Sequence, residues 1–379
     1  MKKNQKIIVV IILVIISLTT IWLFYNQAIG KYYSDLNSHI EAALDNNISN
    51  YSILGIIYKV LDIYCGKNLG IAIFLTCMII LNIYVTNKLL EYYMKPNTQY
   101  RIWIYAILLN FAIAIYIPFI HTYWNIGVQE ANEWHNSTYI CMKAAGILAI
   151  LLFLKIENNY LQKIDIYEYI LFCIALSLVN AIKPNFILAF APTMLIYLII
   201  DFFKNIKNKK AIINIIIFGC AVLISLLVLV YQWKVLYVED FEAGIRIDKM
   251  SLLKRIHKYP IISMVQSAAF PLFILVTNFK RIIKDRKYSF IYLFSLIALL
   301  EYLFLKETGL RAQHGNFEWG YSFSLMIAFI TSVSILEEIR ERELEDKKYY
   351  LAMGYTLLSL HILSGLAYFC FLIQGYLYF

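Results

Sequence analysis

The residues best suited to chemistry lie in three polar segments of an otherwise apolar chain. The first segment is SDLNSHIEAAL from Ser34, in which Asp35 and His39 stand four residues apart and would share one flank of a helix. An aspartate of ordinary pKa is ionised at neutral pH and can accept a proton from an attacking hydroxyl. We therefore expect Asp35 to be a general base. The alternative is that Ser34 or Asp35 only caps the short helix.

The second segment, 122–143, contains Trp134, His135 and Asn136 in consecutive positions. A loop that only joined two membrane helices would not need an indole, an imidazole and a carboxamide together. We expect His39 and His135 to orient a carboxylate or bind a phosphate oxygen. We expect Trp134 to stack on a sugar ring, a role that Trp124 and Trp319 also fit. The alternative for the tryptophan is the aromatic belt found at this depth in membrane proteins.

Cations near the ends of apolar runs form the third group. Lys143, Lys183 and Arg311 are candidates because a charge at a membrane helix end is costly without a partner. Arginine offers a bidentate fork and lysine a point charge, and both suit a phosphate or pyrophosphate. The alternative is snorkelling of the side chains to lipid headgroups. Hydrogen-bonding residues that we also expect to bind substrate lie beside these cations, in the turn AIKPNF and the segment RAQHGNFEWG: Asn185, His314 and Asn316.

The elements that position these residues are membrane helices. With 61% hydrophobic and 16% charged residues, the 379-residue chain is predicted to be an all-α, polytopic transmembrane bundle forming one domain over 1–379. Apolar runs of spanning length predict about eleven spans, the first of them uncleaved: 7–25, 70–91, 101–120, 138–155, 166–182, 186–203, 211–232, 260–279, 288–305, 319–336 and 349–370. In the first loop, 26–69, apolar residues at helical spacing predict two amphipathic helices lying in the interface.

The charge pattern predicts the orientation of these spans. Lys2, Lys3 and Lys6 precede the first span, and basic runs such as KNIKNKK from Lys204 fall on the same side. The positive-inside rule places this side, and the N-terminus, in the cytoplasm. The chain is therefore expected to be a multi-pass protein of the cell membrane. The three polar segments then all face outside. The run EEIRERELEDKK from Glu337 is expected to be a solvated helical linker.

Several classes of function lack their sequence signatures. The chain contains no Walker loop, GxGxxG, HExxH or DxD pattern, so a soluble nucleotide donor is not expected. The six cysteines are isolated, and no residue pattern supports a divalent metal or other cofactor. The net charge of +9 is explained by the basic loops, so nucleic acid is not an expected partner.

The segments SDLNSHI, NEWHNSTY, KPNF and GNFEWGY, and the order of span, loop with an early Asp and further spans, resemble the GT-C class of integral membrane glycosyltransferases. The resemblance is to bacterial members, and the bias towards Ile, Lys, Asn and Tyr also suggests a bacterial source. It implies that Asp35 occupies the place of the catalytic loop carboxylate. The implied reaction moves a sugar from a polyprenyl-phosphate donor to an envelope glycan or lipid acceptor on the extracytoplasmic face, among membrane lipids. The second acidic residue of many members would be Glu130 or Glu133 here, and no counterpart of their large soluble C-terminal domain is expected.

Three other functions stay open at this point. A polysaccharide polymerase or ligase using polyprenyl-pyrophosphate donors should have paired arginines outside, whereas Arg246, Arg255 and Arg311 are spread apart. A transporter or lipid flippase should have mid-membrane charges and broken helices, for which His361 and two prolines, Pro192 and Pro271, are the signs. A purely structural membrane protein would not need the polar outer loops.

Overall fold

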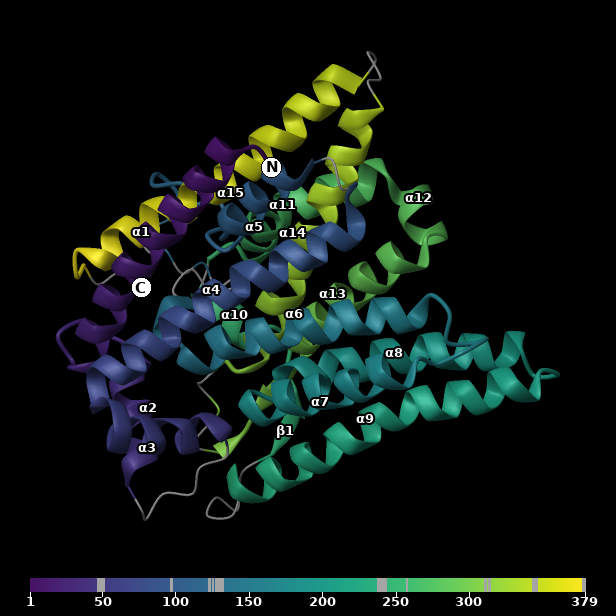
Figure 1. Cartoon of the computed structure of the whole chain (residues 1–379), viewed down its shortest axis with the longest axis horizontal. Helices are drawn as coiled ribbons and strands as arrows, with labels where there is room; N and C mark the ends of the chain where they lie inside the picture. Colours follow the sequence, from purple (N-terminus) through teal and green to yellow (C-terminus); the bar gives the residue numbers. More distant parts are fainter. Residues whose placement is uncertain are drawn as a thin grey trace.

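The chain folds into a bundle of long helices with almost no sheet (Figure 1). The computed structural model describes residues 1–45, 52–95, 98–121, 124, 126, 133–236, 244–256, 258–309, 312, 315–342 and 347–376. Among these residues, nine helices are long and apolar enough to cross a membrane, which identifies a multi-pass membrane protein. They are α1 (Lys3–Ala28), α4 (Lys67–Tyr93), α6 (Ser137–Glu157), α8 (Asn185–Lys204), α9 (Lys209–Leu236), α11 (Pro260–Thr277), α13 (Arg286–Phe304), α14 (Phe317–Glu341) and α15 (Lys348–Ile373).

Every predicted span but one coincides with a helix. Helix α7 (Ile166–Ile182) is apolar but has only 17 residues, at the short end of the spanning range. The prediction for 101–120 is wrong. Helix α5 (Gln99–Leu109) stops after 11 residues, and the chain then continues without regular secondary structure to residue 121. The eleven predicted spans are therefore nine long helices, one short helix and one broken span.

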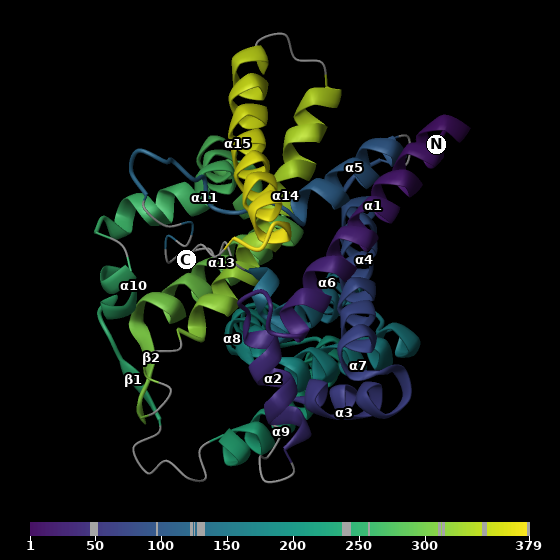
Figure 2. The same ribbon diagram turned by 90° about the vertical axis from the view of Figure 1, so that its left-hand side faces the viewer.

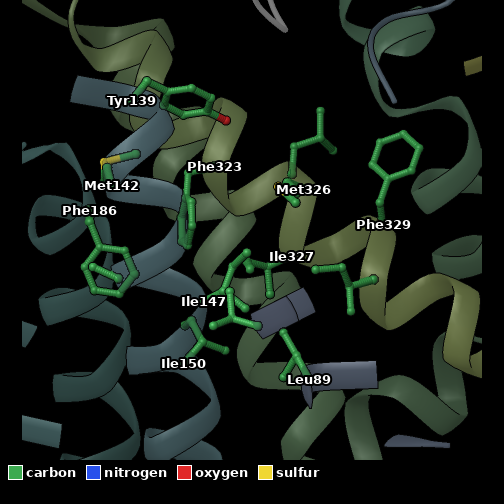
Figure 3. Packing of buried hydrophobic residues seen from close by; sticks show 14 of the residues in the cluster. Leu89, Tyr139, Met142, Ile147, Ile150, Phe186, Phe323, Met326, Ile327 and Phe329 are labelled. Carbon is green, nitrogen blue, oxygen red and sulfur yellow. The ribbon is translucent and has the colours of Figure 1, made fainter. Parts of the chain in front are cut away.

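Helices α6 and α14 form the centre of the bundle. In their most apolar stretches, 89% and 94% of the residues are buried, whereas α9 and α1 bury only 22% and 28%. Gly146 of α6 faces the ring of Phe323 in α14, and a Cβ at this glycine would come within 2.6 Å of that ring. Small residues allow this close helix contact in membranes, and Figure 3 shows the surrounding packing. Because both helices begin at the same end of the bundle, their N-termini meet there.

The two predicted amphipathic helices are confirmed as α2 (Asp35–Leu44) and α3 (Ile53–Cys65). Both lie at the end of the bundle where α6 begins (Figure 2). Ser34 and Ser52 are their N-caps, and each hydroxyl also donates to a remote carbonyl, that of His135 at 3.0 Å and that of Ile182 at 2.8 Å. The helices are thereby fastened to the segments that enter α6 and leave α7. We call this end of the bundle the site face.

The other end, the opposite face, is closed by ion pairs. The Arg286 guanidinium binds Asp201 at 2.6 and 2.5 Å and also contacts Glu157, and Asp201 accepts a hydrogen bond from Tyr160. The prediction of a solvated linker from Glu337 is wrong for its first residues, which belong to α14. Helix α14 continues to Glu341, and Glu337 is buried. Its carboxylate accepts from four side chains: Arg101 at 2.8 Å, Tyr105 at 2.7 Å, Tyr355 at 2.6 Å and Arg340 at 2.8 Å.

Short elements complete the described fold. Strands β1 (Ile245–Ile247) and β2 (Leu305–Glu307) pair antiparallel, with Arg246 opposite Lys306. Helix α10 (Ser251–Ile256) follows β1, helix α12 (Phe279–Lys284) precedes α13, and a single 3₁₀ turn, η2 (Glu133–His135), precedes α6. The strands were not predicted, because three residues are too few for a periodic pattern.

Candidate functional site

Asp35 is the first residue of α2, and its carboxylate is not used to cap that helix. The cap is Ser34, whose hydroxyl accepts a hydrogen bond from the Leu36 N–H at 3.0 Å. The Asp35 Oδ2 instead lies 3.2 Å from Nε2 of His135, which belongs to η2. The expected cap is therefore Ser34 and not Asp35, and two residues that lie far apart in the sequence, Asp35 and His135, come into contact.

The surroundings of Asp35 keep it ionised. Burial raises its pKa, but the hydrogen bond with His135 and the electrostatic attraction of His135 and Lys183 lower the pKa below the ordinary 3.8. The side chain is still 44% exposed. At neutral pH Asp35 is thus an anion that a molecule from solution can reach.

His39 connects α2 to the start of α6. Its Nδ1 lies 3.3 Å from the hydroxyl of Ser137, the first residue of α6. Burial lowers the pKa of His39 from 6.5 to about 4; Asp35 opposes this shift, while Lys183 and His135 add to it. His39 is therefore neutral at physiological pH. It can donate or accept a hydrogen bond but supplies no charge.

Lys183 is a buried cation at the N-terminus of α6. It follows the last residue of α7, and its Nζ lies 3.0 Å from the Thr138 hydroxyl and 3.3 Å from Oδ1 of Asn136. Asn136 is the N-cap of α6 and accepts from the Tyr139 N–H at 2.9 Å. The helix N-terminus carries a partial positive charge of its own. Lys183 and α6 thus concentrate positive potential where an anion would be attracted.

Asn185 and Asn316 join the elements around this cation. The Asn185 side chain, at the start of α8, donates to the Asn316 carbonyl at 2.6 Å, and the Asn316 amide donates to Glu307 of β2. A Cβ at Gly320 would come within 3.0 Å of the Asn185 carbonyl oxygen, so α14 also packs closely on α8. In this structure both carboxamides position α8, α14 and β2.

The structure reassigns two other candidates. Trp134 is buried, and its ring lies 5.6 Å from that of Phe111 and 4.8 Å from that of Phe369, centroid to centroid. This packing is that of a core residue. The prediction that Trp134 stacks on a sugar is therefore corrected, because its ring is covered by Phe111 and Phe369. Lys143 is buried inside α6, with its Nζ 5.7 Å from the Tyr139 ring centroid. It lies below the site face, not at its rim.

Trp319 of α14, a candidate for sugar stacking by residue type, lies at the site, as does Thr138 of α6, which the sequence did not assign. The Trp319 ring is 5.8 Å from the His135 ring and 4.8 Å from the Lys183 ammonium. Both residues lie within the polar segments already singled out, EWG after Asn316 and NST after His135. Asn136 followed by two hydroxyl residues also fits a helix N-cap, and that signal could have indicated the start of α6.

Some expected residues fall outside the part of the chain that the structure describes. Arg311, His314 and Glu130 belong to this group, as does the side chain of Glu133. Among the described residues, no group of three or more His, Cys, Asp or Glu side chains could hold a metal ion.

Comparison of the sequence with models of known protein families and with curated proteins gave no match. The function is therefore argued from the geometry of the site.

Proposed function

We propose that this chain is a GT-C-like membrane glycosyltransferase that moves a sugar from a polyprenyl-phosphate donor to a glycan or lipid acceptor. The observation that carries the proposal is the pair of Asp35 and His135, an ionised and accessible carboxylate held 3.2 Å from an imidazole, beside a buried lysine. The positive-inside rule would place the N-terminus in the cytoplasm and the site face outside.

Asp35 would be the general base. The acceptor hydroxyl gives its proton to the carboxylate while its oxygen forms a bond to the anomeric carbon of the sugar. The bond between that carbon and the phosphate oxygen breaks, and its electron pair leaves with the phosphate. His135 would orient the carboxylate, since Ser34 and its own bond to Asp35 fix η2 against α2.

The phosphate would be bound where positive potential is highest. Lys183 and the N-terminus of α6 both favour an anion, and their attraction grows as negative charge develops on the leaving phosphate. Trp319, next to both His135 and Lys183, would offer its ring to the sugar. Holding donor and acceptor together would supply much of the remaining rate enhancement.

Transport of a lipid-linked molecule is the second candidate, and one observation favours it. The broken span after α5 is a feature of many transporters, whose sites lie at interrupted helices. The carboxylate of Asp35, however, lies at the end of the bundle and not beside the break. We therefore rank transport below sugar transfer.

The test uses a strain that lacks the gene, complemented with variants at equal membrane abundance. Surface glycans are then measured by mass spectrometry. We expect Asp35→Asn to lower transfer of one sugar by roughly 100-fold or more, the contribution of a general base. Glu41→Gln is the matched control, because Glu41 is an exposed carboxylate on the same helix that contacts Asn37. Full restoration by Asp35→Asn would remove the base from the mechanism, and an unchanged glycan profile in the deletion strain would favour transport.

A further inference from the structure

Residues 110–121, which we call the strap, follow the early end of α5. The strap has no regular secondary structure, and it lies beside α11 and α15 (Figure 2). Non-helical backbone inside a bilayer needs its polar groups satisfied by protein or by a water-filled cavity. The contacts of the strap show which of the two applies.

Helix α15 binds the strap through side chains as well as backbone. His361 Nδ1 lies 2.6 Å from the Ile113 carbonyl oxygen, and the Ser364 hydroxyl accepts from the Tyr116 N–H at 3.1 Å. Gly365 makes this approach possible, because a Cβ there would come within 1.5 Å of the Phe111 carbonyl oxygen. His361 is thus a buried residue that hydrogen-bonds to backbone groups of the strap and of α11.

Helix α11 binds the strap from a second direction. The Gln266 carbonyl accepts from the Ile115 N–H at 3.2 Å, and Gln266 Oε1 lies 2.9 Å from Nε2 of His121. Protein groups, and not water, therefore satisfy the backbone donors of Ile113, Ile115 and Tyr116.

Ile113 and Tyr116 of the strap are bound near the middle of α15, and His121 is bound to Gln266, the seventh residue of α11. His361 is near the middle of the 26-residue α15, so it is roughly 18 Å along the helix axis from either end at about 1.5 Å per residue. The hydrocarbon core of a bilayer is about 30 Å thick. Groups bound to His361 and Ser364 therefore lie within the hydrocarbon depth.

The strap reverses direction in an apolar turn, 118–120. The Ile117 carbonyl accepts from the N–H groups of Ile120 and His121, both at 3.0 Å, and Pro118 has no N–H to satisfy. Of the backbone donors in 118–121, the Phe119 N–H alone has no acceptor among the described residues. The side chain of Phe119 is 99% exposed and that of Ile120 is 52% exposed. Because so few of its backbone N–H groups lack an acceptor, the turn can lie in an environment without water.

We propose that the turn 118–120 is a lipid-contact surface, against which the acyl chain of a bilayer phospholipid packs. Three observations support this partner: the depth of the strap, the apolar character of the turn and its internally satisfied hydrogen bonds. Helices α11 and α15, which hold the strap, also expose apolar side chains, such as Val265 and Leu363. The break in this span thus gives the membrane direct contact with the strap.

The test measures the surroundings of residue 119 by spin labelling of the full chain in phosphatidylcholine vesicles. Phe119→Cys carries a nitroxide in a background with the six native cysteines replaced by alanine. Ile247→Cys is the matched control, because Ile247 in β1 is equally apolar and highly exposed but lies outside the spans. We expect oxygen, which concentrates in hydrocarbon, to collide with the label at 119 and a water-soluble nickel chelate not to reach it. The ratio of the two collision rates should be several-fold higher at 119 than at 247.

Two results would overturn the proposal. Access of the nickel chelate to residue 119 would show a water-filled cavity, and protection from both reagents would show that protein, such as a second copy of the chain, covers the turn. Should the cysteine-free chain not fold, Phe119→Trp and Ile247→Trp in the native chain give the same comparison. Lipids brominated along their acyl chains should then quench the added fluorescence of the first and not of the second. Neither version depends on sugar transfer.

Discussion

The two ends of the bundle contain the same types of residue and use them differently. At the opposite face, Asp201 and Glu337 are buried, and arginine and tyrosine donors occupy both carboxylates. At the site face, Asp35 contacts a histidine and remains 44% exposed. A carboxylate whose oxygens are occupied by fixed donors cannot take up a proton from a substrate, whereas a partly exposed one can. The number of donors around a carboxylate thus separates a structural role from a chemical one.

The largest effect that would test this comparison is on stability. Asp201→Asn leaves the Arg286 guanidinium with Glu157 alone and removes a charge-assisted bond to Tyr160. Breaking a buried ion pair costs about 3–5 kcal/mol, so we expect a correspondingly lower free energy of unfolding in detergent. Transfer per folded molecule should stay unchanged, because Asp201 lies at the opposite face.

The control for this variant is Asp285→Asn, on the same face. Asp285 caps α13, is 41% exposed and lies 3.7 Å from the Lys287 ammonium. Exposed pairs contribute about 0–1 kcal/mol, so this variant should be nearly as stable as the wild type. Equal losses from both substitutions would contradict the distinction between buried and exposed carboxylates.

A smaller effect, on the pH dependence of stability, is expected from His39 at the site face. The pKa of His39 is about 4 in the folded chain and near 6.5 when unfolded. Between these values the unfolded state binds more protons, so stability falls as the pH is lowered from about 6.5 to 4. His39→Gln should remove a contribution on the order of 3 kcal/mol from this pH dependence.

Thermal unfolding of wild type and His39→Gln at several pH values measures this difference. The neighbours Asp35, His135 and Lys183 are present in both proteins, so the difference in slope belongs to His39. Parallel pH profiles would show that His39 is not held neutral by its surroundings.

Local patterns explain which parts of the fold could be predicted. Helices α2 and α3 followed from apolar spacing within a dozen residues, and most spans followed from length and composition. The strap did not, because its backbone is held by His361 and Ser364, which lie 248 residues away from their partners in the sequence. An apolar run looks the same whether its hydrogen bonds are internal or supplied by other helices.

The site shows the same limit. Residue types singled out Asp35, His135 and Lys183, and the structure places them together. The sequence could not decide between Trp134 and Trp319, since an indole suits both a core and a binding surface. The deciding fact was the position of each ring, among Phe111 and Phe369 in one case and beside His135 in the other.

The smallest predicted effect concerns the contact that joins α2 to the site. Ser34→Ala removes both the cap of α2 and the bond to the His135 carbonyl, and loss of a cap costs about 1 kcal/mol. Asp165→Ala is the matched control, because Asp165 caps α7 at the opposite face. We expect similar losses of stability, measured by unfolding in detergent, but lower sugar transfer only for Ser34→Ala, since only this cap fixes Asp35 relative to His135. Equal transfer by the two variants would show that Asp35 does not depend on its attachment to η2, and the carboxylate would then act without a positioned partner.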